Sequence, residues 1–194
     1  RAGATKGIEG TKNLHLFEGK ATFVENNKIS ILTKEGAMET LSAEKIFINT
    51  GASPAIPDIE GIEAINYLTS TTILDLKEVP EHLLIVGGGY IGLEFGQMFR
   101  RFGAKVTLLE RGNRLMPKED DDVCEVMSEI VKEEAIDVLV NSEAIKFEKQ
   151  GKDQIQVHIK GPDGTHNVSC THVLIASGRK PQTTDLGLEL TGVT

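Results

Sequence analysis

Three closely spaced glycines are the residues of this sequence whose type and spacing most directly indicate chemistry. Gly87, Gly89 and Gly92 stand at the spacing G-x-G-x-x-G. Glycine permits a tight turn, lets backbone N–H groups approach a bound group without an intervening Cβ, and lets a helix lie close to a strand. Because the free N–H groups at the start of a helix attract phosphate, such a loop is typical of a site for the pyrophosphate of a dinucleotide.

The residues around the glycines predict the elements that such a loop needs. Before it, the apolar residues 83–86 predict a buried parallel strand. After it, helical spacing predicts a helix whose apolar face consists of Ile91, Phe95, Met98, Phe99 and Phe102. Residues 105–109 predict a second strand, which ends before Glu110, an acid that can accept hydrogen bonds from a ribose diol. Together these features predict a dinucleotide site, with a glycine turn in an unrelated α/β domain as the alternative.

The composition narrows the class of protein. The 194 residues are 39% hydrophobic and 26% charged, with a net charge of -8. Without an apolar run near the ~20 residues of a membrane span, and without a basic patch, we expect neither a membrane nor a nucleic acid as partner. The two cysteines, Cys124 and Cys170, lie far apart, and the five histidines have no metal-ligand spacing. We therefore assign no metal site, and we expect a cytoplasmic protein with packed, reduced cysteines.

Before the glycine loop, the sequence predicts an antiparallel meander followed by a buried strand. The meander strands are residues 20–25, 28–33 and 39–41, with a hairpin turn at Asn26-Asn27. Residues 45–49 (KIFIN) predict a further strand that runs into Thr50-Gly51. Residues 70–76 predict a short helix started by a hydroxyl cap.

After Glu110, the order of elements is similar. A helix is predicted from Asp120 to about Ala135, with its buried stripe at Val123, Met127, Ile130 and Val131. The acids at its start complement the helix dipole and do not indicate a functional site. Further strands are predicted at residues 137–140, 144–149, 154–160, 167–170 and 172–176, the last ending at Ser177-Gly178. A meander, a buried strand and a small residue before glycine thus occur twice, which favours two doubly wound domains that share a plan.

Three segments in this order resemble the flavoprotein pyridine nucleotide–disulfide oxidoreductases, the family that includes dihydrolipoamide dehydrogenase, glutathione reductase and mercuric reductase. The segments are INTGASPAIPDIEG, GGGYIGLEFGQMFRRFGAKVTLLERGNRLMP and VLIASGRKPQTTDLGLE. The similarity covers essentially residues 16–194 and is greatest to mercuric reductase and dihydrolipoamide dehydrogenase-like members.

The resemblance implies an α/β fold: a Rossmann-like nucleotide-binding domain with a parallel sheet plus an antiparallel β-meander, flanked by partial FAD-domain segments. It implies that residues 1–80 are part of the FAD-binding domain and that residues 81–177 form the NAD(P)-binding domain. Residues 178–194 would then begin the return to the FAD domain.

The resemblance also implies roles around the glycine loop. Gly87, Gly89 and Gly92 would hold the pyrophosphate of NAD, and Glu110 would hold the adenosine ribose. Tyr90 stands where some relatives carry a gate residue that covers the flavin, although an aromatic residue that caps the loop is the alternative.

Other residues are assigned to the nicotinamide and flavin ends of the site. Glu94 matches an acid that orients the nicotinamide amide, with a plain solvated helix acid as the alternative. Gly178 would admit the nicotinamide ribose or carboxamide, whereas Arg179 would lean toward the FAD. Thr50 and Gly51 would line the flavin side.

The choice between the two nicotinamide dinucleotides depends on three residues. Glu110 would repel a 2′-phosphate and favours NAD, whereas Arg111 and Arg114 would attract one. We expect NAD as the cofactor, with NADP less favoured.

Several parts of the family pattern are missing from this sequence. These are the first FAD-binding G-x-G-x-x-G, the C-x-x-x-x-C redox pair, a later Gly-Asp, and a carboxyl-terminal dimer domain with its His-Glu pair. The chain also starts at Arg1 without Met, so we expect a cut or processed chain.

We therefore expect a central fragment that binds a nicotinamide dinucleotide but does not complete catalysis. The full-length protein would be a homodimeric FAD- and NAD(P)H-dependent oxidoreductase that passes a hydride to flavin and then electrons to a disulfide or to mercuric ion. A non-catalytic nucleotide-binding, redox-sensing module and an NADH oxidase or peroxidase-type flavoprotein are the alternatives.

Overall fold

The structure is a computed structural model that describes residues 7–8 and 10–193. Residues 1–6, 9 and 194, which include the outer limits of the predicted domains, lie outside the described residues. The chain divides into two units: the first runs up to Gly51 and resumes at Pro181, and the second is Ala52–Lys180.

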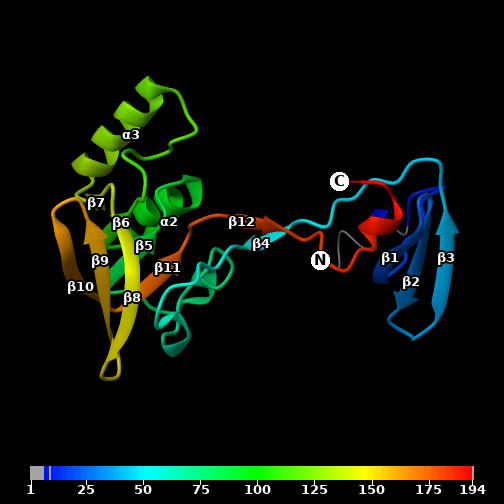
Figure 1. Cartoon of the computed structure of the whole chain (residues 1–194), viewed down its shortest axis with the longest axis horizontal. Coiled ribbons are helices and arrows are strands. Elements are labelled where there is room, and N and C mark those ends of the chain that lie inside the picture. The colour runs from blue at the N-terminus through cyan, green and yellow to red at the C-terminus, as the bar shows by residue number, and fades with distance from the viewer. Residues whose placement is uncertain (1–6, 9, 194) are drawn as a thin grey trace. The chain divides into compact units, whose positions relative to one another are not determined.

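The first unit contains the predicted meander. Strands β1 (Gly19–Glu25), β2 (Lys28–Thr33) and β3 (Met38–Ser42) form an antiparallel sheet in that order, drawn in blue in Figure 1. Phe23 and Ile31 are its buried side chains. The returning segment with the 3₁₀ turn η3 (Leu188–Leu190) packs on β1, where Phe23 N donates to Leu186 O at 2.7 Å.

The predicted strand at residues 45–49 is not formed. These residues have no ladder partner, and the Phe47 side chain is 90% exposed. A parallel strand exists only when a neighbouring strand pairs with its N–H and C=O groups. The described part of the first unit offers only the meander, whose three strands pair with one another, so the prediction is wrong for this chain.

The second unit is built on a four-stranded parallel sheet with the order β11-β5-β6-β7. Its strands are β5 (His82–Val86), β6 (Lys105–Leu109), β7 (Asp137–Leu139) and β11 (His172–Ile175). Helix α2 (Tyr90–Arg101) connects β5 to β6, and α3 (Asp121–Glu133) lies between β6 and β7 in the sequence. The predicted strand, loop, helix and strand are therefore confirmed.

The two faces of this sheet are covered by different layers. Leu83 and Ile85 face a core with Leu93, Phe99 and Val131 of the helices. Leu84, the residue between them, faces a second core with side chains of an antiparallel meander, including Phe147, Val157 and Ile159. The alternation follows from the twofold period of a strand. A parallel sheet with antiparallel strands confirms the mixed α/β class.

The second meander consists of β8 (Glu143–Gln150), β9 (Gln154–Gly161) and β10 (Gly164–Cys170), in the order β10-β9-β8. Its strands are yellow and orange in Figure 1. Two short strands, β4 (Ala52–Pro54) and β12 (Arg179–Pro181), pair with each other where the chain passes between its two units.

Residues 52–80 pack with the parallel sheet, although the sequence assigns them to the FAD-binding domain. Leu68 N donates to Val173 O at 2.7 Å, and Leu68 O accepts from Ile175 N at 2.9 Å. Ile73 is 1% exposed. The boundary between the two packed units therefore lies after Gly51 and not at residue 80. The assignment of residues 52–80 to the FAD-binding domain stays a prediction. The predicted helix at residues 70–76 is only the 3₁₀ turn η2 (Ile73–Asp75), and η1 (Ile62–Ala64) precedes it.

The buried faces of both helices differ in part from the predicted stripes. Phe102 is 60% exposed and Val123 is 39% exposed, whereas Leu93 and Cys124 are buried. Phe99 is buried, and Phe95 and Met98 pack against the same core, as the predicted row requires. Phe102 differs because α2 ends at Arg101 and Phe102 is its C-cap residue. None of the helices in the described part of the chain has the length and apolar character that a membrane span requires.

Candidate functional site

The glycine loop follows β5 directly and has a backbone that requires glycine at its first position. Gly87 has φ +117°, and a Cβ there would lie 2.5 Å from Ala176 O. Its N–H donates to Leu109 O at 2.8 Å, which ties the loop to the end of β6. By contrast, a Cβ on Gly89 would meet no atom within 4 Å, so the backbone is open to a bound group at this point.

The start of α2 is packed against this turn. A Cβ on Gly92 would lie only 2.0 Å from Gly87 O, so any larger residue displaces the loop or the helix. Gly89 is the N-cap and makes no side-chain capping bond. The N–H groups of the first turn have no partner within a helix, and their dipoles favour an anion.

The Glu110 carboxylate accepts hydrogen bonds from two backbone segments, the glycine loop and the loop after β6, residues 111–120. Its Oε2 accepts from Gly88 N at 2.8 Å, and its Oε1 accepts from Gly112 N at 2.6 Å. Each carboxylate oxygen has further lone-pair capacity, so the half-buried group can also accept from a ligand. The acid therefore combines a structural role with a negative charge at the carboxyl end of β6.

A cleft of about 640 Å³ lies beside the loop. Its lining includes Val86, Gly87, Leu109, Glu110, Arg111 and Ser177. The structure thus brings Gly87, Glu110 and Arg111 to one cleft. Arg114, the second predicted arginine, does not line this cleft. It forms an ion pair with Asp121, and its Nη2 donates to Glu119 O at 3.4 Å.

Tyr90 is held by an acid that the sequence did not indicate. Its ring is 56% exposed, and its hydroxyl donates to the Glu119 carboxylate. This hydrogen bond is the main reason why the pKa of Tyr90 is raised. The two residues are 29 positions apart, and only the path of the loop after β6 brings them together. Glu94 is exposed on α2.

The remaining predicted residues lie on the two segments in which the chain passes from one unit to the other, near Gly51 and near Lys180. In the first unit, Thr50 Oγ1 donates to Gln182 O at 2.6 Å, and Gly51, with φ +77°, accepts from Gln182 N at 2.9 Å. In the second unit, Gly178 has φ +144° and Arg179 donates to the carbonyl of Ala52. These hydrogen bonds stabilise the two segments that connect the units.

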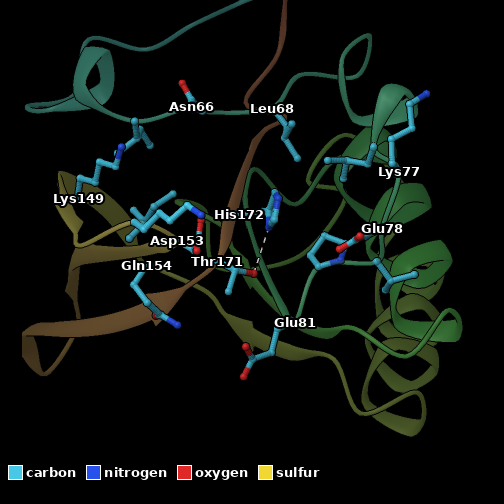
Figure 2. Close-up of a pocket in the computed structure, with 16 residues that line it drawn as sticks. Asn66, Leu68, Lys77, Glu78, Glu81, Lys149, Asp153, Gln154, Thr171 and His172 are labelled. Carbon is cyan, nitrogen blue, oxygen red and sulfur yellow. Dashed lines mark hydrogen bonds between the residues drawn. The ribbon is translucent and has the colours of Figure 1, made fainter.

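A larger cavity, of about 760 Å³, lies at the amino ends of the strands of the parallel sheet (Figure 2). It contacts Glu81 before β5 and Thr171-His172 at the start of β11, and contains none of the predicted site residues. His172 Nδ1 lies 3.1 Å from Thr171 Oγ1, and burial lowers the pKa of the imidazole. Since the glycine loop is at the carboxyl ends of the strands, this cavity is separate from it.

The cysteines behave as packed side chains. Both are free and buried, and burial raises the pKa of Cys170 to about 12, which leaves it as an unreactive thiol. Among the described residues, no group of three or more His, Cys, Asp or Glu side chains is arranged for a metal ion.

Comparisons with known proteins match nearly the whole chain to one family. The family model described as pyridine nucleotide-disulphide oxidoreductase matches residues 2–194. A mercuric reductase of Streptomyces lividans is 39% identical over 92% of this chain and 37% of its own length. A dihydrolipoyl dehydrogenase of Geobacillus stearothermophilus is 31% identical over 97% of this chain and 40% of its own.

A solved structure gives the same result. The HOCl-induced flavoprotein disulfide reductase RclA from Escherichia coli matches with a TM-score of 0.84 and 35% identity, over 100% of this chain and 43% of that one. The chain therefore spans about two fifths of the length of these relatives.

Proposed function

The chain belongs to the pyridine nucleotide-disulphide oxidoreductase family, and from this premise we propose that its second unit is the nicotinamide-dinucleotide-binding part of an FAD-dependent oxidoreductase. The observation that carries the proposal is the contact between Gly92 and Gly87. A Cβ at Gly92 would lie 2.0 Å from Gly87 O, so only glycine allows the start of α2 to lie at the turn. That packing leaves the helix N–H groups beside the open backbone of Gly89, where a pyrophosphate fits.

Each neighbouring residue has a role in this proposal. The N–H groups of the loop and of the first turn of α2 bind the phosphates. Glu110 accepts hydrogen bonds from the adenosine ribose, and its charge disfavours a 2′-phosphate, which makes NAD the better ligand than NADP. Arg111, which lines the cleft, supplies a positive charge near the nucleotide.

The nicotinamide end is assigned to other groups. The bound cofactors supply the redox chemistry, namely hydride transfer from nicotinamide to flavin and then electron transfer to a disulfide or to another acceptor such as mercuric ion. Tyr90 is the gate residue that covers the flavin until the nicotinamide displaces it, and Glu94 orients the amide. Gly178, which has no side chain, permits close approach.

The rest of the chain is assigned to the flavin side. We place residues 1–80 and 178–194 in the FAD-binding domain and residues 81–177 in the NAD(P)-binding domain. Thr50, Gly51 and Arg179 line the flavin side. The full-length protein would be a homodimer, and the two free buried cysteines of this chain suit the reducing cytoplasm.

Titration calorimetry of the chain with NADH and with NADPH tests the proposal. We expect one site, with NADH bound more tightly than NADPH. The absence of binding heat for both dinucleotides at millimolar concentration would refute the proposal, and tighter binding of NADPH would refute the role of Glu110.

A turnover assay tests the assignment of this chain as a part of the enzyme. With FAD, NADH and an artificial dye as acceptor, we expect little sustained dye reduction. Robust reduction would show that these 194 residues contain a complete catalytic centre.

A further inference from the structure

Residues 55–59, which we call the wall segment, form part of the wall of the cleft beside the glycine loop. They line the cleft of about 640 Å³ together with the glycine loop and the end of β6. At the first end of the segment, Ala55 N donates to Gly178 O at 3.0 Å, and Ala55 O accepts from Ser177 Oγ at 3.3 Å. Among the described residues, none forms a hydrogen bond with the backbone of residues 56–58. The position of this wall therefore depends on how the segment is attached at its ends.

The second end of the wall segment is attached to strand β8. Glu60, the residue that follows the segment, accepts a backbone hydrogen bond from Phe147 N at 2.8 Å and forms a parallel bridge with Lys146. Gly61 has φ +79°, and a Cβ there would lie 2.1 Å from Phe147 O. Glycine at this position therefore lets the chain lie directly against the backbone of β8.

Charged side chains add a second connection at this end. Lys146 Nζ lies 3.0 Å from Glu60 Oε1 and 2.8 Å from Glu148 Oε1. Glu148 Oε2 in turn lies 3.2 Å from His158 Nε2 on the neighbouring strand β9. Hydrogen bonds to Glu148 and Glu60 raise the pKa of Lys146, so its ammonium group stays charged. A single exposed ion pair contributes little, but several charges in one network hold each other in place.

We propose that Lys146 is a positioning residue for the dinucleotide, because through Glu60 it holds the wall segment in the position that shapes the cleft. The inference rests on the proposed function, since it concerns the same binding site. Lys146 does not itself line the cleft, so it acts on a ligand only through the segment that it holds. Without the Glu60–Lys146 ion pair the wall segment moves more freely, and ordering it on binding lowers the affinity for the dinucleotide.

Amide hydrogen exchange followed by NMR measures the attachment without any nucleotide. Because Phe147 N donates to Glu60 O, exchange of the Phe147 amide requires the chain at Glu60 to detach from β8. We expect this amide to exchange about 2- to 5-fold faster in Lys146→Gln and in Glu60→Gln, the range for loss of one exposed ion pair. Lys146→Arg, which keeps the charge, should exchange like the unmodified chain. Amides of the parallel sheet should keep their rates in all variants, because the change is local.

Calorimetry with NADH measures the effect on the cleft. Lys146→Gln and Glu60→Gln should each bind NADH about 2- to 5-fold more weakly than the unmodified chain. The double variant should bind no more weakly than Lys146→Gln, because both changes remove the same ion pair, and Lys146→Arg should bind like the unmodified chain. Glu63→Gln is the matched control: it makes the same chemical change at an exposed residue three positions after Glu60 that forms no ion pair with a described residue.

Two outcomes overturn the inference, with folding of each variant checked by circular dichroism. The first is a Phe147 amide that exchanges at the same rate in Lys146→Gln and in the unmodified chain. The second is equal NADH affinity in Lys146→Gln and Glu63→Gln, which leaves the proposed function standing. If the unmodified chain binds no NADH, the proposed function fails and the inference fails with it.

Discussion

Substitution of Gly92 by alanine isolates the contact on which the proposed nucleotide site depends. The added methyl group would lie 2.0 Å from Gly87 O and 3.4 Å from Ile85 Cγ2. Because Cβ atoms do not approach other heavy atoms closer than 3.0 Å, the turn and the helix must separate by about 1 Å at this point. The atom in contact belongs to the backbone of the glycine loop, so a side-chain rotation cannot relieve the overlap.

The size of the effect follows from two opposing contributions. Overpacking of this kind costs about 1–3 kcal/mol, whereas replacing glycine by alanine inside a helix gains roughly 1 kcal/mol. We expect Gly92→Ala to lower the free energy of unfolding by up to about 2 kcal/mol. The displacement of the helix start also weakens its hydrogen bonds to phosphate, and the loss of one charged hydrogen bond corresponds to about tenfold weaker NADH binding.

Gly96→Ala is the matched control, because it makes the same chemical change one turn along the same helix. Its methyl group would meet Ile85 Cδ1 at 3.3 Å, the end of a flexible side chain. Urea unfolding followed by circular dichroism gives the stability, and calorimetry gives the NADH dissociation constant. If Gly92→Ala matched Gly96→Ala in both measurements, the close packing of α2 on the turn would not be what builds the site.

Three further predictions concern the charges of the second unit. Glu110→Ala should narrow the affinity difference between NADH and NADPH in parallel titrations, and it should also weaken NADH binding because the loop loses two hydrogen bonds. Arg111→Ala should weaken dinucleotide binding in the same assay without changing the urea midpoint, whereas Arg114→Ala should lower that midpoint, since this arginine holds the loop after β6. Burial, with a smaller contribution from a nearby lysine, lowers the pKa of His82, so its neutral form is favoured in the folded chain. Because the unfolded chain takes up a proton on His82 more readily than the folded chain, the free energy of unfolding falls as the pH drops below the unfolded pKa of about 6.5. Above that pH, His82 is neutral in both states and this loss is absent. In urea titrations at several pH values, His82→Gln should flatten this loss, and an unchanged slope would contradict the role of His82.

The parts of the fold that were predictable are those in which local pattern and tertiary environment agree. The run at residues 83–86, the glycine spacing and the alternation in both meanders each require one kind of element. Residues 45–49 have an equally strong strand pattern and form no strand, because strand formation depends on a pairing partner that a local pattern cannot supply. Phe102 has the correct helical spacing, but α2 ends at Arg101, so Phe102 is the C-cap residue and is 60% exposed.

The candidate site divides in the same way. The positions of Gly87, Gly92 and Glu110 in the fold were predictable from their spacing, since one strand–turn–helix–strand unit fixes them, while their role in binding stays a prediction. Glu119 was not found, because its contact with Tyr90 depends on how an irregular ten-residue loop folds back over the glycines. The two arginines show the same limit. The sequence treats Arg111 and Arg114 alike, and only the structure shows that the second is engaged by Asp121 and Glu119.

If Glu110 selects NAD over NADP as we propose, its hydrogen bonds link this choice to the geometry of the loop. One carboxylate oxygen holds Gly88, inside the glycine loop, and the other holds Gly112, in the segment that continues to Glu119. A substitution made to admit a 2′-phosphate would therefore also remove the carboxylate link between these segments and leave Met116 N to Gly88 O, at 3.0 Å, to join them. Selectivity for NADP is then not reached by removing the acid alone. It would require a replacement that keeps the hydrogen bonds to Gly88 N and Gly112 N without the charge, and Glu110→Gln, whose amide retains one acceptor oxygen, can replace only one of the two.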